Sequence, residues 1–217
     1  MKSDSQLQRD IFDEMRWDPQ VGRAELGIAV KDGVVTLSGT VGTYSQKLAG
    51  ERAAERVSGV KAVADDVQVH LQGSGKRTDT EIAHAAVNAF TWDTEVPNDK
   101  IIVKVDNGWI TLDGSVPYRF QSDAAERAVR FLIGVKGVTN LIHVSPPVST
   151  FEVKTKIEEA FKRSASIDSK QISVESLNGK ITLKGTVRSW AERRDAERAA
   201  WSAPGVKEVE DRILVSV

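Results

Sequence analysis

The chain has 217 residues, with 30 Lys and Arg against 31 Asp and Glu, so its formal net charge is −1. This balance argues against a dedicated nucleic-acid-binding protein, which normally carries a clear basic excess. There is no cysteine, which excludes disulfide scaffolds, thiolate metal sites and cysteine nucleophiles. The three histidines, His70, His84 and His143, stand far apart at no metal-ligand spacing, so we expect neither a metal nor a cofactor.

The N-terminal residues and the apolar runs of the sequence bear on the location of the protein in the cell. The N-terminal residues MKSDSQLQRDIFDEM are polar from the second position, unlike the basic and apolar regions of a secretory signal peptide. No apolar run approaches the ~18 residues of a membrane-spanning helix. The expected location is therefore the cytoplasm, or the periplasm if a leader has been removed from the natural chain.

One sequence unit occurs three times. The segments KDGVVTLSGTV, DNGWITLDGSV and LNGKITLKGTV begin at residues 31, 106 and 177. In each copy a second glycine follows the turn glycine at the same distance along the chain, as Gly59, Gly134 or Gly205. The tripeptide Glu-Arg-Ala precedes that second glycine at a constant spacing, beginning at Glu51, Glu126 or Glu197. Identical spacing at several landmarks indicates a triplicated domain of about 70 residues rather than a solenoid of short motifs.

The expected domains are 1–72, 76–145 and 148–217. Gln-Gly-Ser-Gly (72–75) separates the first two copies, and Ser-Pro-Pro (145–147) separates the second and third. A Gly/Ser linker is a flexible coil, whereas consecutive prolines favour a stiffer, extended link. We therefore expect domains 1 and 2 to be less fixed relative to each other, unless their surfaces dock.

Each copy begins with a predicted helix. Ser3, Thr78 and Ser149 are each followed three residues later by Gln or Glu, which is the capping-box pattern. In the first copy the helix should end near Asp18, because Pro19 disfavours helical backbone at the preceding residue. Apolar residues recur every four positions and form one helical face: Leu7, Ile11 and Met15; Ile82, Ala86 and Phe90; Val153, Ile157 and Phe161.

A hairpin, a second helix and a last strand follow in each copy. The turns are Asp-Gly or Asn-Gly, dipeptides that accept a positive φ at both positions, and their glycines are Gly33, Gly108 and Gly179. Alternate residues of the next strand are apolar, so one strand face should point inward. Small apolar residues let the second helix approach the sheet, and a strand such as 63–69 closes the unit. The order αββαβ predicts the α+β class, as three tandem small sandwiches with the helices on one face of a short sheet.

These landmarks resemble the BON (bacterial OsmY and nodulation) domain family. The motif that carries the resemblance is V-x-x-G-x-V-x-L-x-G-x-V, followed further along by A-x-x-x-x-G-V-x-x-V-x-x-x-L/I-x-V. In the second copy it runs from Val105 through Gly108, Leu112 and Gly114 and then from Gly134 to Val144. The resemblance covers almost the whole chain, three times. It implies an αββαβ fold and a non-enzymatic role in bacteria, commonly attachment to phospholipid or the cell envelope, in osmotic and envelope stress, or assistance to the folding of other proteins.

The residues themselves predict no enzyme. No Ser/His/acid arrangement recurs in the three copies, and units of about 70 residues seldom have room for a catalytic pocket. A glycine-rich phosphate site needs amides at a helix N-terminus, whereas Gly33 and Gly39 stand on either side of a hairpin strand. We therefore interpret Gly33, Gly108 and Gly179 as structural turn residues.

Several aromatic residues stand where the sibling copies have charged ones. Trp17 and Trp92 correspond to an arginine in the third copy, and Trp109, Phe131 and Trp201 correspond to a charged residue in at least one copy. Positions that alternate with charged residues are expected at the surface, and exposed aromatics mark interfaces. The alternative is that these aromatics pack between docked domains.

The third copy is the most basic, with 13 Lys and Arg against 11 Asp and Glu. Arg193 and Arg194 lie close to Trp190 on its predicted second helix, and cations beside an aromatic are typical of contact with anionic lipid. The acidic residues interspersed among them also suit an ordinary solvated helix face.

Two functions therefore stay open. The first is a binding module of the osmotic or envelope-stress type that contacts anionic phospholipid or a membrane surface. The second is a protein-interaction scaffold or chaperone-like adaptor that binds a protein partner or self-associates. Nucleic acid is not expected as a partner. The candidate lipid or partner surface comprises Trp17, Trp92, Trp109, Phe131, Trp190, Arg193, Arg194 and Trp201.

Overall fold

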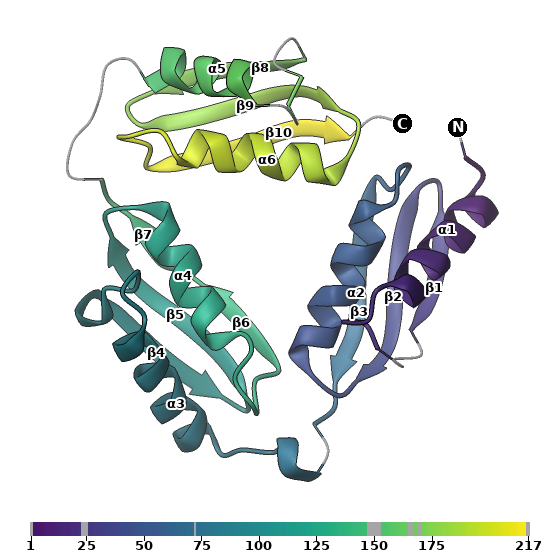
Figure 1. Cartoon of the computed structure of the whole chain (residues 1–217), viewed down its shortest axis with the longest axis vertical. Coiled ribbons are helices and arrows are strands. Elements are labelled where there is room, and N and C mark those ends of the chain that lie inside the picture. Colours follow the sequence, from purple (N-terminus) through teal and green to yellow (C-terminus); the bar gives the residue numbers. More distant parts are fainter. Residues whose placement is uncertain are drawn as a thin grey trace.

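The computed structural model describes residues 2–22, 26–71, 73–146, 153–164, 167–168 and 171–215, which form three domains of the same design (Figure 1). Domain 1 contains α1 (Asp4–Trp17), β1 (Gly27–Lys31), β2 (Val34–Val41), α2 (Tyr44–Arg56) and β3 (Ala62–Val69). After the short helix η1 (Gly73–Gly75), domain 2 contains α3 (Asp79–Trp92), η2 (Asn98–Lys100), β4 (Ile101–Asp106), β5 (Trp109–Val116), α4 (Arg119–Val129), β6 (Gly137–Asn140) and β7 (His143–Val144). Domain 3 contains α5 (Val153–Arg163), β8 (Ile172–Leu177), β9 (Lys180–Val187), α6 (Trp190–Trp201) and β10 (Glu208–Val215).

Each domain has a small mixed sheet with the second hairpin strand in the middle. In domain 1, β2 is antiparallel to β1 and parallel to β3, and β9 has the same relation to β8 and β10 in domain 3. In domain 2 the last strand is divided, and β6 and β7 both pair in parallel with β5. The predicted αββαβ order and α+β class are therefore confirmed.

The predicted ends of the first helices agree with the structure where it describes them. The Ser3 hydroxyl accepts a hydrogen bond from the Gln6 amide at 3.3 Å, and Thr78 and Glu81 form a complete capping box. Asp18 is the C-cap of α1, as expected before Pro19. The third predicted cap, Ser149 with Glu152, lies outside the described residues.

The hairpin turns have the predicted left-handed backbone. The φ angles are 54° and 80° at Asp32 and Gly33, and the two other turns have nearly the same values. The first helix also holds the turn, which the sequence did not predict. The carboxylate of Asp4 accepts hydrogen bonds from the amides of Asp32 and Gly33 at 2.9 and 3.2 Å, and Asp79 does the same in domain 2.

Each domain encloses its own core between its two helices and one face of its sheet. The apolar faces predicted for the first helices are all buried, as are the inward residues of the middle strands, such as Val35, Ile110 and Leu183. Alanines of the second helices are buried as well, for example Ala53 and Ala125. This close approach of helix to sheet is what a small side chain permits.

The three domains are arranged around a triangle, with the second helices α2, α4 and α6 on its inner side (Figure 1). Contacts join all three pairs of domains, including domains 1 and 3, which are separated along the chain by the whole of domain 2. Two of the aromatic residues that the sequence singled out, Trp190 and Trp201, take part in these contacts.

Candidate interaction surfaces

Trp17 and Trp92 are the most exposed of the tryptophans. They end α1 and α3 at equivalent positions, and their exposed fractions are 84% and 87%. Arg163 of the third copy stands at the equivalent position, and it predicted that both tryptophans lie at the surface, as the structure shows. A large apolar side chain exposed to this extent contributes nothing to a core, and it is available for a partner.

The surface around Trp17 combines apolar and cationic groups. Phe12, on the same helix, is half exposed, and the guanidinium of Arg16 lies 5.7 Å from the centre of its ring. In domain 2 the residue equivalent to Phe12 is Val87, which is also exposed. We call Phe12, Arg16 and Trp17, together with Val87 and Trp92, the first-helix surface.

Trp109 and Phe131 are about half exposed, with exposed fractions of 47% and 56%. Trp109 lies on the sheet face away from the helices, where its indole nitrogen donates to the Thr139 hydroxyl at 2.8 Å. Its ring covers Gly137, where a Cβ atom would collide with it. Trp109 is thus held by its strand neighbours, with one side of the ring open.

Trp190, Arg193 and Arg194 are partly buried by contacts within the molecule. Trp190 packs against the core of domain 1, and its indole nitrogen donates to the Val60 carbonyl at 3.1 Å. Arg194 pairs with Glu55 of domain 1. Arg193 pairs with Asp211 at 2.7 Å and lies over the Trp190 ring, 4.9 Å from its centre. Part of the surface predicted around Trp190 is therefore occupied by domain 1.

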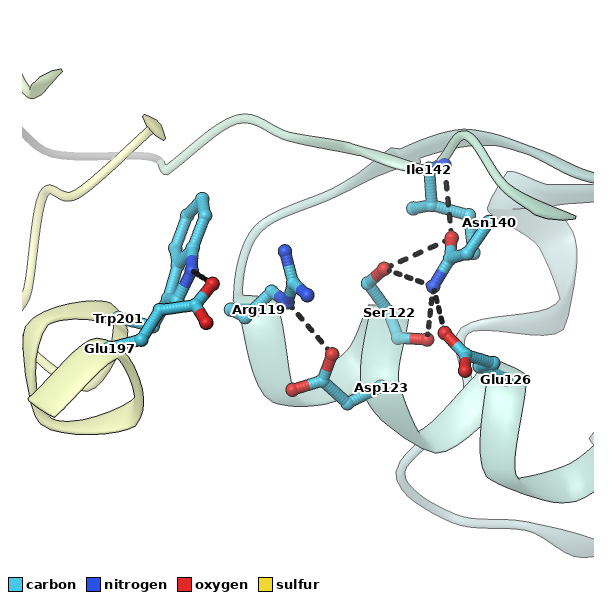
Figure 2. A network of polar contacts seen from close by, with 8 residues as sticks. All are labelled: Arg119, Ser122, Asp123, Glu126, Asn140, Ile142, Glu197 and Trp201. Carbon is cyan, nitrogen blue, oxygen red and sulfur yellow. Dashed lines mark hydrogen bonds and ion pairs between the residues drawn. The ribbon is translucent and has the colours of Figure 1, made fainter. Parts of the chain in front are cut away.

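Trp201 is half-buried at the junction of domains 2 and 3. The guanidinium of Arg119 lies 4.8 Å from the centre of its ring, while Arg119 also pairs with Asp123 at 2.7 Å (Figure 2). On its own helix, the Trp201 indole nitrogen donates to Glu197 at 3.3 Å. A groove of about 600 Å³ runs beside this junction, lined by residues that include Tyr118, Phe120 and Trp201.

Tyr44 makes the corresponding contact between domains 1 and 2. Its ring packs against the core of domain 2. Burial raises the pKa of its hydroxyl group, against the opposing effect of a hydrogen bond with the Val138 backbone. Domains 1 and 2 therefore dock in spite of their glycine-rich linker. The groove beside this junction has a volume of about 280 Å³ and includes Phe131 in its lining.

A pair of polar residues joins the second helix to the last strand in every domain, and the sequence reasoning missed it. The pairs are Lys47 with Asp65 at 3.1 Å, Ser122 with Asn140 at 3.0 Å, and Arg193 with Asp211 at 2.7 Å. Figure 2 shows the second pair, in which Asn140 also donates to Glu126. These positions are equivalent in an alignment of the three copies. The residues differ in chemistry from copy to copy, so no repeated motif marks them in the sequence.

No cluster of metal-binding side chains is found among the residues that the structure describes. Within those residues no three His, Asp or Glu side chains gather closely enough to hold a metal ion. The helices described are also too short or too polar to span a bilayer. What the geometry offers is a set of exposed aromatic surfaces and interdomain grooves.

The chain is similar to a curated protein and to two solved structures. It is 32% identical to the osmotically-inducible protein Y of Escherichia coli (strain K12) over 120 residues, which are 54% of this chain and 60% of that protein. The match thus spans less than two thirds of the relative's length. Two structures of CdsD, a structural protein of the type III secretion system of Chlamydia trachomatis, are 16% and 15% identical to this chain. They cover 96% and 100% of it, and it covers 91% and 100% of theirs, both with a TM-score of 0.27. Such scores are too low to relate the overall arrangements.

The decisive comparison is with domain families. The family model of the BON domain matches three stretches, residues 3–70, 78–146 and 149–216, which together make up nearly the whole chain. These stretches coincide with the three αββαβ units of the structure. The chain therefore belongs to the BON domain family and carries three tandem copies of the domain.

Proposed function

We propose that this chain is a non-enzymatic binding module of the osmotic or envelope-stress type, and that it binds anionic phospholipid through the first-helix surface. The observation that carries the proposal is the exposure of Trp17 and Trp92 at equivalent positions of two domains. Tryptophan is well suited to the interface between lipid headgroups and acyl chains, because its ring is apolar and its N–H is polar.

Two further features support the proposal. Arg16 places a cation next to Phe12 and Trp17, and a basic residue near an anionic membrane contributes about 1 kcal/mol to binding. The similarity to a protein named for its osmotic induction supports a role in the same kind of stress. The partial burial of Trp190 against domain 1 favours the first-helix surface over α6 as the site of lipid contact.

Vesicle co-sedimentation tests the proposal. The full chain should sediment with vesicles of phosphatidylglycerol and phosphatidylcholine, and much less with phosphatidylcholine alone. Binding should weaken in about 1 M NaCl, which shortens the Debye length to about 3 Å. The double variant Trp17→Ala/Trp92→Ala should lose roughly tenfold in affinity, because it removes the exposed apolar area that the membrane would bury. Trp109→Ala, on the opposite side of its sheet, is the matched control and should bind normally.

Equal binding by the parent chain and the double variant would contradict the first-helix surface as the site. Failure of the parent chain to sediment with either vesicle would overturn the lipid proposal. The second candidate, a protein-interaction scaffold, is favoured by the fixed and half-open ring of Trp109. It predicts concentration-dependent self-association that Trp109→Ala reduces and salt does not.

A further inference from the structure

We infer that the first residue of each second helix is a docking residue with which one BON domain binds the next, and that Trp190 uses this device to close the chain into a ring of three domains. The three residues are Tyr44, Arg119 and Trp190, the first residues of α2, α4 and α6. They are equivalent, because each stands at the same distance along the chain from the turn glycine of its own copy.

Each docking residue contacts the following domain in a cyclic order. Tyr44 packs on the core of domain 2, Arg119 lies over Trp201 of domain 3, and Trp190 packs on the core of domain 1. The side chains differ in chemistry, as an aromatic alcohol, a guanidinium and an indole. Their position and direction of contact are nevertheless the same in all three domains, which indicates one docking geometry.

The receiving surfaces are equivalent as well. Near the end of the second helix one position is occupied by Glu55, Arg130 or Trp201, each equally far along the chain from the docking residue of its own domain. Glu55 receives Arg194 from domain 3, and Trp201 receives Arg119 from domain 2. Arg130 and Tyr44 line the same groove between domains 1 and 2. The same patch thus accepts the neighbour in every domain.

The grooves beside the two linked junctions repeat the same pattern. One is lined by residues of 42–45 and 130–135, and the other by residues of 117–120 and 201–206, which are the equivalent positions. A head-to-tail interface that is used repeatedly closes into a ring when its rotation brings the last unit onto the first. Three domains achieve this here, since α6 contacts α2 and Trp190 reaches Val60.

The closing junction differs from the other two in its covalent connection. Domains 1 and 2, and domains 2 and 3, are neighbours along the chain, whereas domain 3 meets domain 1 only through side-chain and backbone contacts. Its stability therefore depends on Trp190 and on the pair of Arg194 with Glu55, helped by the high effective concentration that the connecting domains impose. Opening this junction would leave the other two docked.

Charge reversal across the closing junction gives a direct test. The chain has no cysteine, so one cysteine at exposed Gln68 and one at exposed Leu214 can carry a donor and an acceptor dye. Energy transfer is measured on the labelled full chain diluted into an excess of unlabelled chain, so that only intramolecular transfer is recorded. We expect Arg194→Glu to lower the closed-to-open ratio by roughly tenfold or more, because it replaces an ion pair with two facing carboxylates.

The double reversal Arg194→Glu/Glu55→Arg should restore transfer, which a general loss of folding would not allow. Trp190→Ala should lower transfer as well. Arg198→Glu is the control on the same helix, since the Arg198 side chain is 75% exposed and pairs with Asp195 within α6, and it should leave transfer unchanged. The proposal is overturned if transfer is the same in the parent chain, Arg194→Glu and Trp190→Ala, or if the double reversal remains as open as Arg194→Glu.

Discussion

At the scale of single residues, the equivalent glutamates Glu51, Glu126 and Glu197 have different electrostatic surroundings. Glu126 accepts a hydrogen bond from Asn140 at 3.2 Å, and Glu197 accepts one from the Trp201 indole. Glu51 has both acidic and basic neighbours, and the acidic ones have the larger effect on its pKa. Burial raises the pKa of its carboxyl group, and the nearby carboxylates of Glu55 and Asp65 raise it further. The ionised form of Glu51 is therefore a source of instability in the folded chain.

Glu51→Gln should stabilise the protein at pH 7. The carboxyl group has a pKa near 4.5 in the unfolded chain and a higher one in the folded chain, so the folded state binds more protons between those two values. The free energy of unfolding accordingly falls as the pH rises through this window. The variant should avoid that loss and raise the melting temperature by about 2 °C at pH 7, with no gain well below pH 4.5.

Thermal melts over this pH range check the prediction, and Glu81→Gln is the control of opposite sign. Hydrogen bonds from Thr78 lower the pKa of the Glu81 carboxyl group. Its stabilising effect is present above the unfolded pKa and is lost as the pH falls through the folded one. A Glu51→Gln variant that melted below the parent chain at pH 7 would contradict the assigned burial effect.

At the scale of elements, a polar pair fixes the second helix on the last strand. In domain 2, Ser122 and Asn140 form the pair, and the side-chain oxygen of Asn140 also accepts from the Ile142 amide at 3.1 Å. Asp65 and Asp211 accept from the amide two residues on in the same way. The strand residue thus accepts the same backbone hydrogen bond in all three domains, and it is Asp where the helix partner is a cation and Asn where that partner is a serine.

Asn140→Asp should destabilise domain 2, because it places a second carboxylate beside Glu126 while the helix partner Ser122 is uncharged. The expected cost is about 1–3 kcal/mol, the usual penalty for an uncompensated, partly buried polar group. Adding Ser122→Lys recreates the Lys47–Asp65 pair of domain 1, and it should recover a large part of the loss. Chemical denaturation of the three proteins measures both effects. A double variant no more stable than Asn140→Asp would show that the pairs are not interchangeable.

The sequence predicts elements far better than it predicts contacts between domains. Capping residues, turn glycines and four-residue apolar spacing are local signals, so they placed α1 and the hairpin turns correctly. Exposure of Trp17 followed from its charged counterpart in the third copy. Trp190 illustrates the limit: its role depends on how domain 3 is oriented toward domain 1, and no spacing within one domain encodes that orientation. Packing between docked domains was accordingly foreseen for the aromatics only as an alternative.

At the scale of the whole molecule, docking compensates for the thin cores of small domains. A domain of about 70 residues buries a modest share of its surface, so its own core supplies limited stability. Tyr44 and Trp190 each extend the core of a neighbouring domain. The stability of one domain should therefore depend on whether the domain that docks on it is folded.

This dependence can be measured by weakening one core and observing another domain. Ile181 is fully buried in domain 3, and Ile181→Ala should destabilise that domain by about 2–5 kcal/mol. If Trp190 lends stability to domain 1, amide hydrogen exchange should also become faster in domain 1, around Val60 and the residues of α1. In a Trp190→Ala background, where this support is already absent, the same Ile181→Ala change should no longer affect domain 1.

Unchanged exchange in domain 1 on Ile181→Ala would mean that the domains fold independently, whatever their contacts. Faster exchange that persists in the Trp190→Ala background would place the coupling in the path through domain 2 instead.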